Sequence, residues 1–304
     1  RTHGQRPHRR RYMTQPVLDR FLPSERTTAG YLLRVSRPRF WLYLAGPVVV
    51  GVAYAARTPG ELFAPLAIAL FAYFLLPANV FLYGVNDVFD ADVDADNPKK
   101  DEAGREVRYH GGRLVPGLVA LTGARAVAFV PSLPAGGVVA LAAFLFLAVE
   151  YSAPPLRFKT TPFLDSVSNG LYVLPGVVAY AAIAGSAPPP AAVLGGWLWT
   201  MGMHTFSAIP DIEPDRAAGI ETTATALGAS RTYVYCGLCW LAAAAVFGTV
   251  HPFFAAVLGV YPIFVAFVAV SGVSVDRAYW WFPVLNTAAG TALTLAALWV
   301  MLYG

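Results

Sequence analysis

Residues 166–210 read SVSNGLYVLPGVVAYAAIAGSAPPPAAVLGGWLWTMGMHTFSAIP and contain no Asp, Glu, Lys or Arg. The stretch is long enough for two membrane-spanning helices of about 20 residues each, with a break at the prolines before residue 191. A second uncharged stretch, 232–275, is only one residue shorter and has the same character. Both are continuously apolar rather than alternating, which favours helices over a transmembrane β-barrel. The sequence therefore predicts an all-α integral membrane protein.

The composition of the whole chain agrees with this prediction. Of its 304 residues, 57% are hydrophobic and 13% are charged, and the mean hydropathy is +0.53. A soluble globular domain has about 25% charged residues, so a water-soluble enzyme, a disordered protein and a disulfide scaffold are excluded. The two cysteines, Cys236 and Cys239, form an isolated CxxC pair with no nearby His. We interpret them as small apolar side chains rather than a redox or zinc site.

Apolar runs predict nine transmembrane helices. They are expected over 40–56, 62–84, 114–131, 134–150, 164–184, 190–209, 232–249, 252–272 and 279–302. Lys and Arg concentrate in cytoplasmic loops. With the N-terminus cytoplasmic and the C-terminus outside, all Lys and Arg except Arg57 and Arg125 fall on the cytoplasmic side. A single span at 126–149 in place of the third and fourth is the alternative, but it would move Arg157 and Lys159 outside.

Before the first span, residues 1–29 form a basic tail, and residues 30–304 form one transmembrane domain. The tail is rich in Arg and reads as a cytoplasmic segment near anionic membrane lipid. It shows no cleavable signal peptide. Met13 is a candidate native start, in which case residues 1–12 carry no function. The run Arg9 to Arg11 leaves a nucleic-acid role as a weaker alternative, and we expect no nucleic-acid partner.

Five Asp residues follow the second predicted span, in NDVFDADVDAD at 86–96. On a continuing helix, Asn86, Asp90 and Asp94 share one face, and Asp87 lies one turn before Asp90. Like charges at this spacing repel, so a cation must offset them, and hard oxygen ligands suit Mg²⁺ or Ca²⁺. A solvated polar helix end is the simpler alternative. An EF-hand loop is disfavoured because the sixth position lacks the Gly that its turn requires.

A second acidic cluster ends the sixth predicted span, in IPDIEPDR at 209–216. Asp211 and Asp215 are four residues apart and share one helix face. If the two clusters face each other across a cavity, they can hold divalent ions between them. Mg²⁺ usually completes its shell with phosphate oxygens and water. We therefore expect two Mg²⁺ ions that bridge a diphosphate substrate.

Basic residues on the same side are candidates for binding the phosphates. Arg37 precedes the first span, and Arg157 and Lys159 lie in the short loop YSAPPLRFK at 151–159. Each of them also satisfies the positive-inside pattern without any role in a site. Together with the acidic clusters, they predict an active site that faces the cytoplasm.

Mg²⁺, a diphosphate and a membrane-embedded cavity point to an isoprenoid diphosphate as donor. The metals would neutralise the departing diphosphate, and an electron-rich lipophilic acceptor would capture the allylic cation. Asp90 and Asp211 would then be indispensable for turnover. The sequence shows no Ser-His-Asp set, nucleophile elbow or P-loop lysine. An ion-coupled transporter is the alternative from another class, although the acids gather at one face and no inverted repeat is visible.

Three motifs together resemble the UbiA superfamily of intramembrane prenyltransferases. They are NDxxDxxxD at 86–94, YSxPPxRxK at 151–159, and DxxxD followed by Gly and Thr at 211–222. The resemblance covers about residues 30–300. It implies nine transmembrane helices around a central cavity that is capped by the loops carrying the Asp motifs.

The resemblance also implies roles for single residues. The metal site would comprise Asn86, Asp87, Asp90, Asp94, Asp211 and Asp215, with Asp87 in support. The diphosphate would contact Arg157, Lys159 and, by a weaker match to the family, Arg37. Tyr151 would lie at the reacting end of the donor.

The segment after the first motif departs from the quinone-pathway members, which commonly continue with Asn-(Lys/Arg)-Pro or Arg-Pro and a Gly. Here 97–102 reads NPKKDE. This run and FSAIPDIEPDR at 206–216 look like the lycopene elongase branch, which adds C5 units to lycopene in C50 carotenoid biosynthesis. That resemblance implies dimethylallyl diphosphate as donor, lycopene as acceptor, and association with other enzymes of the pathway. Prenylation of an aromatic quinone precursor or a glycerol-phosphate lipid stays open.

The last step of such a reaction needs a proton acceptor or added water. His204, two turns before Asp211, and Glu150, beside Tyr151, are the candidates. A buried, hydrogen-bonded histidine is the simpler interpretation of His204. Asp165, at the start of the fifth span, is expected either to line the cavity or to cap a helix.

Overall fold

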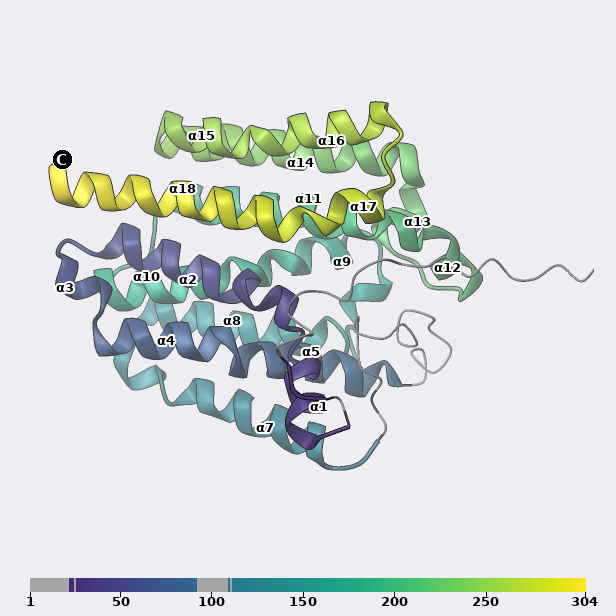
Figure 1. The fold of residues 1–304 in the computed structure, drawn as a ribbon, viewed down its shortest axis with the longest axis horizontal. Coiled ribbons are helices and arrows are strands. Elements are labelled where there is room, and N and C mark those ends of the chain that lie inside the picture. Colours follow the sequence, from purple (N-terminus) through teal and green to yellow (C-terminus); the bar gives the residue numbers. More distant parts are fainter. Residues whose placement is uncertain (1–21, 25, 92–108, 110) are drawn as a thin grey trace, which may run out of the picture.

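The computed structural model of the chain describes residues 22–24, 26–91, 109 and 111–304 (Figure 1). Within these ranges the chain forms helices and no strand. This confirms the all-α class, in which each helix satisfies its own backbone hydrogen bonds. The basic tail predicted over 1–29 lies mostly outside the described residues.

The longer helices carry the apolar runs of the sequence. They are α2 (Trp41–Ala55), α4 (Pro65–Leu75), α5 (Pro77–Phe89), α7 (Leu114–Val127), α8 (Ala135–Glu150), α10 (Leu174–Ala184), α11 (Pro190–Ser207), α14 (Ala229–Val250), α15 (Pro252–Leu258), α16 (Val260–Ser271) and α18 (Phe282–Tyr303). Four of them begin on a proline, α4, α5, α11 and α15. Proline suits a first helical position because its fixed φ matches the helix and its missing N–H has no partner there.

Short helices and 3-10 turns connect the longer ones. They are α1 (Thr28–Val35), η2 (Pro38–Phe40), α3 (Pro59–Leu62), η4 (Val130–Ser132), η5 (Phe158–Thr160), α9 (Leu164–Val167), η6 (Ser168–Tyr172), η7 (Ile209–Asp211), α12 (Ile212–Ala217), α13 (Thr223–Leu227) and α17 (Val275–Trp280). In Figure 1, α1, α12 and α13 lie at one end of the molecule, and α3 and the C-terminus lie at the other.

Every predicted span falls on helical structure, but six helical segments of the described chain are long and apolar enough to cross a membrane. They are Pro59–Phe89, Leu114–Ser132, Leu164–Ala184, Ala229–Val250, Pro252–Ser271 and Phe282–Tyr303. α8 is apolar but shorter, at 16 residues. These segments confirm a protein with several membrane spans. The count of nine and the sides of the two termini stay predictions.

Two hydrophobic clusters hold the helices together. One joins α2, α4, α5, α8 and α10 around side chains such as Leu44, Phe74 and Phe144. The other joins α11 to α14, α16 and α18, where the ring of Trp240 lies 5.9 Å from the rings of both Phe206 and Phe282. Figure 1 shows α14, α16 and α18 as a layer above α2, α4 and α7.

Both cysteines, Cys236 and Cys239, are free and buried, which agrees with their interpretation as small apolar side chains.

α2 and α10 touch through their backbones. A Cβ atom added at Gly51 would lie 2.3 Å from the carbonyl oxygen of Gly176. One added at Gly176 would lie 2.8 Å from the carbonyl oxygen of Pro47. Small residues at such contacts allow membrane helices to approach closely. These glycines therefore fix the distance between two helices of the first cluster.

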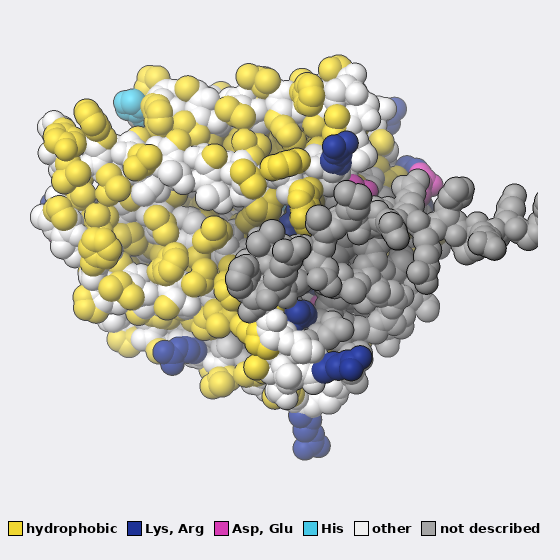
Figure 2. Space-filling view, viewed as in Figure 1, with side chains coloured by type: hydrophobic (Ala, Val, Ile, Leu, Met, Phe, Trp, Pro, Cys, Tyr) yellow, Lys and Arg dark blue, Asp and Glu magenta, His cyan; other side chains and the backbone are white. Residues whose placement is uncertain are grey.

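Large apolar side chains cover much of the outside of the molecule. Val270 is 83% exposed, Ile263 is 71% exposed and Trp299 is 67% exposed. Figure 2 shows hydrophobic side chains spread over the helical face, while Lys, Arg and acidic side chains lie mainly toward the end that carries α1. Exposing such an apolar surface to water is unfavourable. The surface is therefore suited to lipid, with the polar chemistry gathered at one end.

Candidate active site

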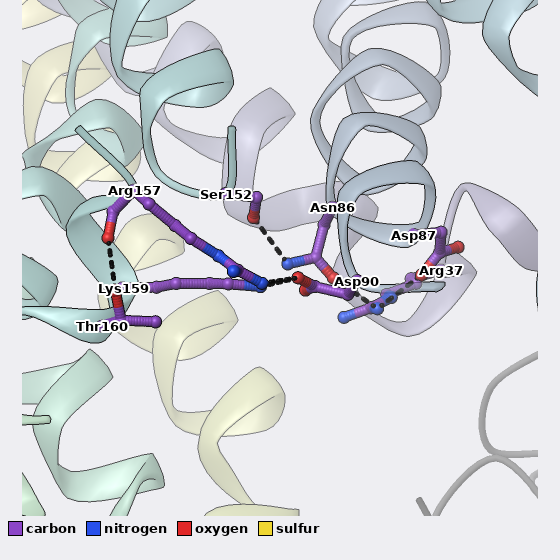
Figure 3. Close-up of polar contacts among 8 residues, drawn as sticks. All are labelled: Arg37, Asn86, Asp87, Asp90, Ser152, Arg157, Lys159 and Thr160. Carbon is purple, nitrogen blue, oxygen red and sulfur yellow. Dashed lines mark hydrogen bonds and ion pairs between the residues drawn. The ribbon is translucent and has the colours of Figure 1, made fainter. Parts of the chain in front are cut away.

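The end of α5 meets the loop that follows α8, and this contact joins three predicted site residues (Figure 3). Lys159 Nζ lies against Asp90 Oδ1, and Arg157 Nη2 lies 3.4 Å from the same oxygen. Asp90 is only 7% exposed. A buried carboxylate is costly unless cations offset its charge. Lys159 and Arg157 supply that compensation.

α5 ends at Phe89, and Asp90 is its C-cap, with its N–H donating to the Asn86 carbonyl at 2.9 Å. The continuous helix expected through Asp94 is therefore interrupted after Phe89. Asp side chains favour helix ends, and a row of like charges weakens a helix. Asp94 itself lies outside the described residues.

Arg37 contacts the first acidic cluster directly. Its Nη2 donates to Asp87 Oδ1 at 3.2 Å and to Asn86 Oδ1 at 3.4 Å. Its guanidinium also lies 4.6 Å from the centre of the Tyr83 ring. Asn86 Nδ2 in turn donates to Ser152 Oγ at 2.9 Å, in the loop after α8. The structure thus brings Arg37, Asn86 and Asp87 together and ties them to the loop that carries Arg157.

Arg37 and Arg157 share an uncommon backbone conformation. Arg37 has φ 50° and ψ 72°, and Arg157 has φ 42° and ψ 56°. Each lies directly before a 3-10 helix, η2 or η5. The left-handed region costs a residue with a Cβ about 1–2 kcal/mol. Such strain clusters at functional sites, and here the ion pairs with Asp87 and Asp90 offset it.

The second acidic cluster lines a cavity of about 630 Å³. Asp211 ends η7 and Asp215 lies in α12, and both side chains are on the cavity wall. The full lining is Tyr151, Arg157, Lys159, Thr160, Asp165, His204, Ala208, Asp211, Asp215, Gly219, Ile220, Glu221 and Thr222. Arg157 and Lys159 therefore face this cavity and also contact Asp90. Through these two cations, the structure joins the two acidic clusters.

Tyr151 and His204 meet at the cavity wall. The Tyr151 hydroxyl lies 3.3 Å from His204 Nε2, and the two rings are perpendicular with centres 5.8 Å apart. Burial, assisted by the charge of Asp165, raises the pKa of the Tyr151 phenol well above its usual value. The phenol, just beyond the end of α8, is therefore neutral. Glu150, the other candidate from the sequence, does not line the cavity, and its Oε2 accepts from the Leu156 N–H at 3.2 Å.

Asp165 both lines the cavity and forms a structural bond. Its carboxylate accepts from the Thr223 N–H at 3.0 Å and from the Thr223 hydroxyl. The Thr223 oxygen accepts from the Phe163 N–H at 2.7 Å. Asp165 and Thr223 are both buried. Sequence reasoning did not find Thr223, because its partner lies 58 residues away and no local motif marks the pair.

The side chains of the site carry atoms that are chemically suited to a divalent cation and to an anion. Asn86, Asp87, Asp90, Asp211 and Asp215 offer the hard oxygen atoms that Mg²⁺ prefers. Within the described part of the chain, no group of three or more His, Cys, Asp or Glu side chains is close enough to hold a metal ion. The buried Nε of Arg157 has no hydrogen-bond partner there. An unpaired buried guanidinium donor suits an anionic ligand such as a phosphate.

The structure thus places carboxylates and cations together at one cavity of a helical membrane fold. Residues 44–299 match the profile of the UbiA prenyltransferase family. The chain therefore belongs to this family and is a prenyltransferase, which confirms the resemblance found in the motifs.

Relatives and solved structures agree with this assignment. The chain is 66% identical to the lycopene elongase/hydratase of Haloarcula japonica, over 93% of this chain and 96% of the relative. It is 63% identical to the lycopene elongase/hydratase of Haloferax volcanii, over 90% of both chains. Its fold is similar to that of a UbiA homolog from Archaeoglobus fulgidus bound to DMAPP and Mg²⁺. That match has a TM-score of 0.62 and 21% identity, and it covers 88% of this chain and 98% of the other.

Proposed function

We propose that this chain is a Mg²⁺-dependent prenyltransferase that ionises dimethylallyl diphosphate and transfers its C5 group to lycopene. The observation that carries the proposal is the placement of Arg157 and Lys159. They contact Asp90 and face the cavity lined by Asp211 and Asp215. The names of the two close relatives support the acceptor, and the fold neighbour that binds DMAPP and Mg²⁺ supports the donor and the metal.

In this proposal the acidic residues hold the metal ions and the basic residues hold the diphosphate. Asn86, Asp87, Asp90 and Asp94 act from one side, and Asp211 and Asp215 act from the other. Two bound Mg²⁺ ions would neutralise the negative charge that develops on the departing diphosphate. Arg157, Lys159 and Arg37 exchange their present carboxylate contacts for phosphate oxygens. Arginine suits this exchange because its planar fork matches phosphate as well as carboxylate.

Tyr151 lies at the reacting end of the proposed site. It shares the cavity wall with Lys159 and Asp211, so a prenyl group that extends from a diphosphate on these residues passes its ring. Its neutral phenol avoids placing a negative charge beside the allylic cation, and its ring face attracts positive charge. Closure of the cavity to water would protect the cation from capture before the acceptor reacts.

We further propose that nine helices span the cell membrane with the site toward the cytoplasm. The bias of Lys and Arg supports this orientation. A cytoplasmic site gives access to a water-soluble diphosphate donor. Lycopene, in contrast, is apolar and would reach the cavity from the membrane.

Purified protein in detergent with Mg²⁺, dimethylallyl diphosphate and lycopene tests the proposal. We expect diphosphate release together with C45 and C50 carotenoids, some of them hydrated. Parallel reactions contain an aromatic quinone precursor or a glycerol-phosphate lipid in place of lycopene. If product forms with one of these compounds and none forms with lycopene, that compound and not lycopene is the acceptor. No product with any donor and acceptor pair would contradict a prenyl transfer by this chain.

A further inference from the structure

The end of the proposed reaction needs a base inside the cavity. Addition of an allylic cation to a carbon–carbon double bond leaves a new, tertiary carbocation. This cation becomes a stable product when an adjacent C–H bond loses its proton, or when water adds and then loses a proton. In both cases one proton must leave. The base that accepts it must lie within hydrogen-bond reach of that proton, directly or through one water molecule.

Glu221, at the cavity wall, is exposed to solvent, and the other carboxylates around the cavity are already engaged. Asp90 is paired with Lys159 and Arg157, and the Asp165 carboxylate accepts two hydrogen bonds from Thr223. Glu150 closes the loop that follows α8 and does not line the cavity. In the proposed function, Asp211 and Asp215 hold metal ions. The base must therefore come from a different side chain.

His204 fills this requirement. It lines the cavity from α11, beside Tyr151. His251, by contrast, lies at the opposite end, where its Nδ1 accepts from the Phe253 N–H at 3.2 Å and caps α15. Imidazole is the side chain best suited to take up and return a proton near neutral pH.

We propose that Tyr151 and His204 form a proton relay that completes the reaction. The inference rests on the proposed prenyl transfer. It is carried by the 3.3 Å separation of the Tyr151 hydroxyl from His204 Nε2 and by the position of both residues on the cavity wall. Tyr151 faces the product cation and His204 stores the proton.

Each step of the relay breaks one bond and forms another. A C–H bond next to the cationic carbon breaks, and its electron pair forms the new double bond. The released proton binds the Tyr151 oxygen while the phenol O–H bond breaks and its proton moves to His204 Nε2. The imidazolium then returns this proton to water. When water adds to the cation instead, the same relay accepts the proton that the added water loses. Elongation with hydration and elongation without it therefore share one proton acceptor.

Three variants test the relay in the full-length protein: His204→Gln, Tyr151→Phe and the double variant. Ionisation of the donor precedes proton transfer, so we expect diphosphate release to continue, with dimethylallyl alcohol as its organic product. Carotenoid product per diphosphate should fall at least about 100-fold in each single variant, the lower end of a general-base contribution. The double variant should fall no further, because residues that act as a unit are not additive. His251→Gln is the matched control and should behave as wild type.

Each other outcome overturns the relay. An unchanged product-to-diphosphate ratio in His204→Gln removes His204 from the step. Loss of diphosphate release together with product assigns the pair to ionisation or to folding. Additive effects in the double variant separate the two residues. If the unaltered protein makes no carotenoid and releases no diphosphate, the proposed function fails instead, and the two failures are distinct.

Discussion

The backbone N–H of Thr223 donates to the Asp165 carboxylate at 3.0 Å and joins α9 to the start of α13. The chain between them contains η7 and α12, which carry Asp211 and Asp215. The position of the second acidic cluster therefore depends on a bond that neither cluster contains. The Thr223 hydroxyl strengthens this link, because it bonds both to Asp165 and to the Phe163 N–H.

Thr223→Val removes the hydroxyl and keeps the shape of the side chain. We expect a loss of about 1–3 kcal/mol in the free energy of unfolding, because it leaves buried partners in Asp165 and Phe163 unsatisfied. Thermal unfolding in detergent measures the loss. Thr223→Ser keeps the hydroxyl and should retain most of the stability. Equal melting temperatures for the Val and Ser variants would contradict the structural role of this bond.

Asp90→Asn and Asp211→Asn test the proposed metal ligands. Each variant removes one negative charge from a side chain of nearly the same size, and we expect diphosphate release to fall at least about 100-fold. The exposed Asp276 in α17 offers a matched control, Asp276→Asn, which should keep full activity. Elution as a single species in size-exclusion chromatography shows that the variants fold. Full activity in Asp90→Asn or Asp211→Asn would remove that residue from the metal site.

Lys159→Gln tests donor binding. Hydrogen bonds to charged groups contribute about 1.5–3 kcal/mol, so its loss should raise the KM for dimethylallyl diphosphate about 10- to 100-fold. Lys159→Arg keeps the charge and should lose less. Arg277→Gln, at an exposed position in α17, is the control. A KM that stays constant in Lys159→Gln would assign the lysine to stabilising Asp90 alone.

Removal of divalent cations tests the metal requirement without mutation. EDTA should abolish diphosphate release, and excess Mg²⁺ should restore it. A ligand that binds only the folded protein raises its melting temperature. Dimethylallyl diphosphate should therefore stabilise the protein in Mg²⁺ more than in EDTA. Equal stabilisation in both would show that the donor binds without a metal ion.

Gly51→Ala tests the contact between α2 and α10. The added methyl would meet the Gly176 carbonyl oxygen, and overpacking of this kind costs about 1–3 kcal/mol of unfolding free energy. Gly46, in the same helix, has no atom within 4 Å of an added Cβ. Gly46→Ala should therefore be neutral or stabilise by up to about 1 kcal/mol. Thermal unfolding measures the melting temperatures of both variants. Gly51→Ala should lower the melting temperature, and Gly46→Ala should leave it unchanged or raise it.

The sequence predicted much of this protein because lipid imposes a strong pattern on it. Apolar runs located the helices, and the clusters around Asp90 and Asp211 marked the candidate site. The pattern was a weaker guide to membrane crossing. Three helices, α2, α8 and α11, form as expected but fall outside the six segments that are long and apolar enough. Length and hydropathy describe one helix at a time, whereas a short or less apolar helix can be held by its neighbours.

The pairs that organise the site were harder to predict. Tyr151 and His204 are 53 residues apart, and Asp165 and Thr223 are 58 apart. Periodicity assigns a residue to a face of its own helix but does not say which residue lies opposite. That choice depends on how helices pack, as at Gly51. The break of the helix after Phe89 was also not predicted, because helix termination depends on surroundings beyond the spacing of its charges.

The contact of Lys159 and Arg157 with Asp90 makes the two proposed ligands thermodynamically dependent on each other. In the proposed function, a metal ion that takes Asp90 would remove this carboxylate contact from both cations, and a diphosphate that takes those cations would leave Asp90 to the metal. Each ligand thus removes the competitor of the other, and by linkage the gain in affinity must be the same in both directions. In the proposed function, the site would therefore select the metal–diphosphate complex over either component alone. A free divalent ion or a bare polyphosphate would have to displace an ion pair without compensation.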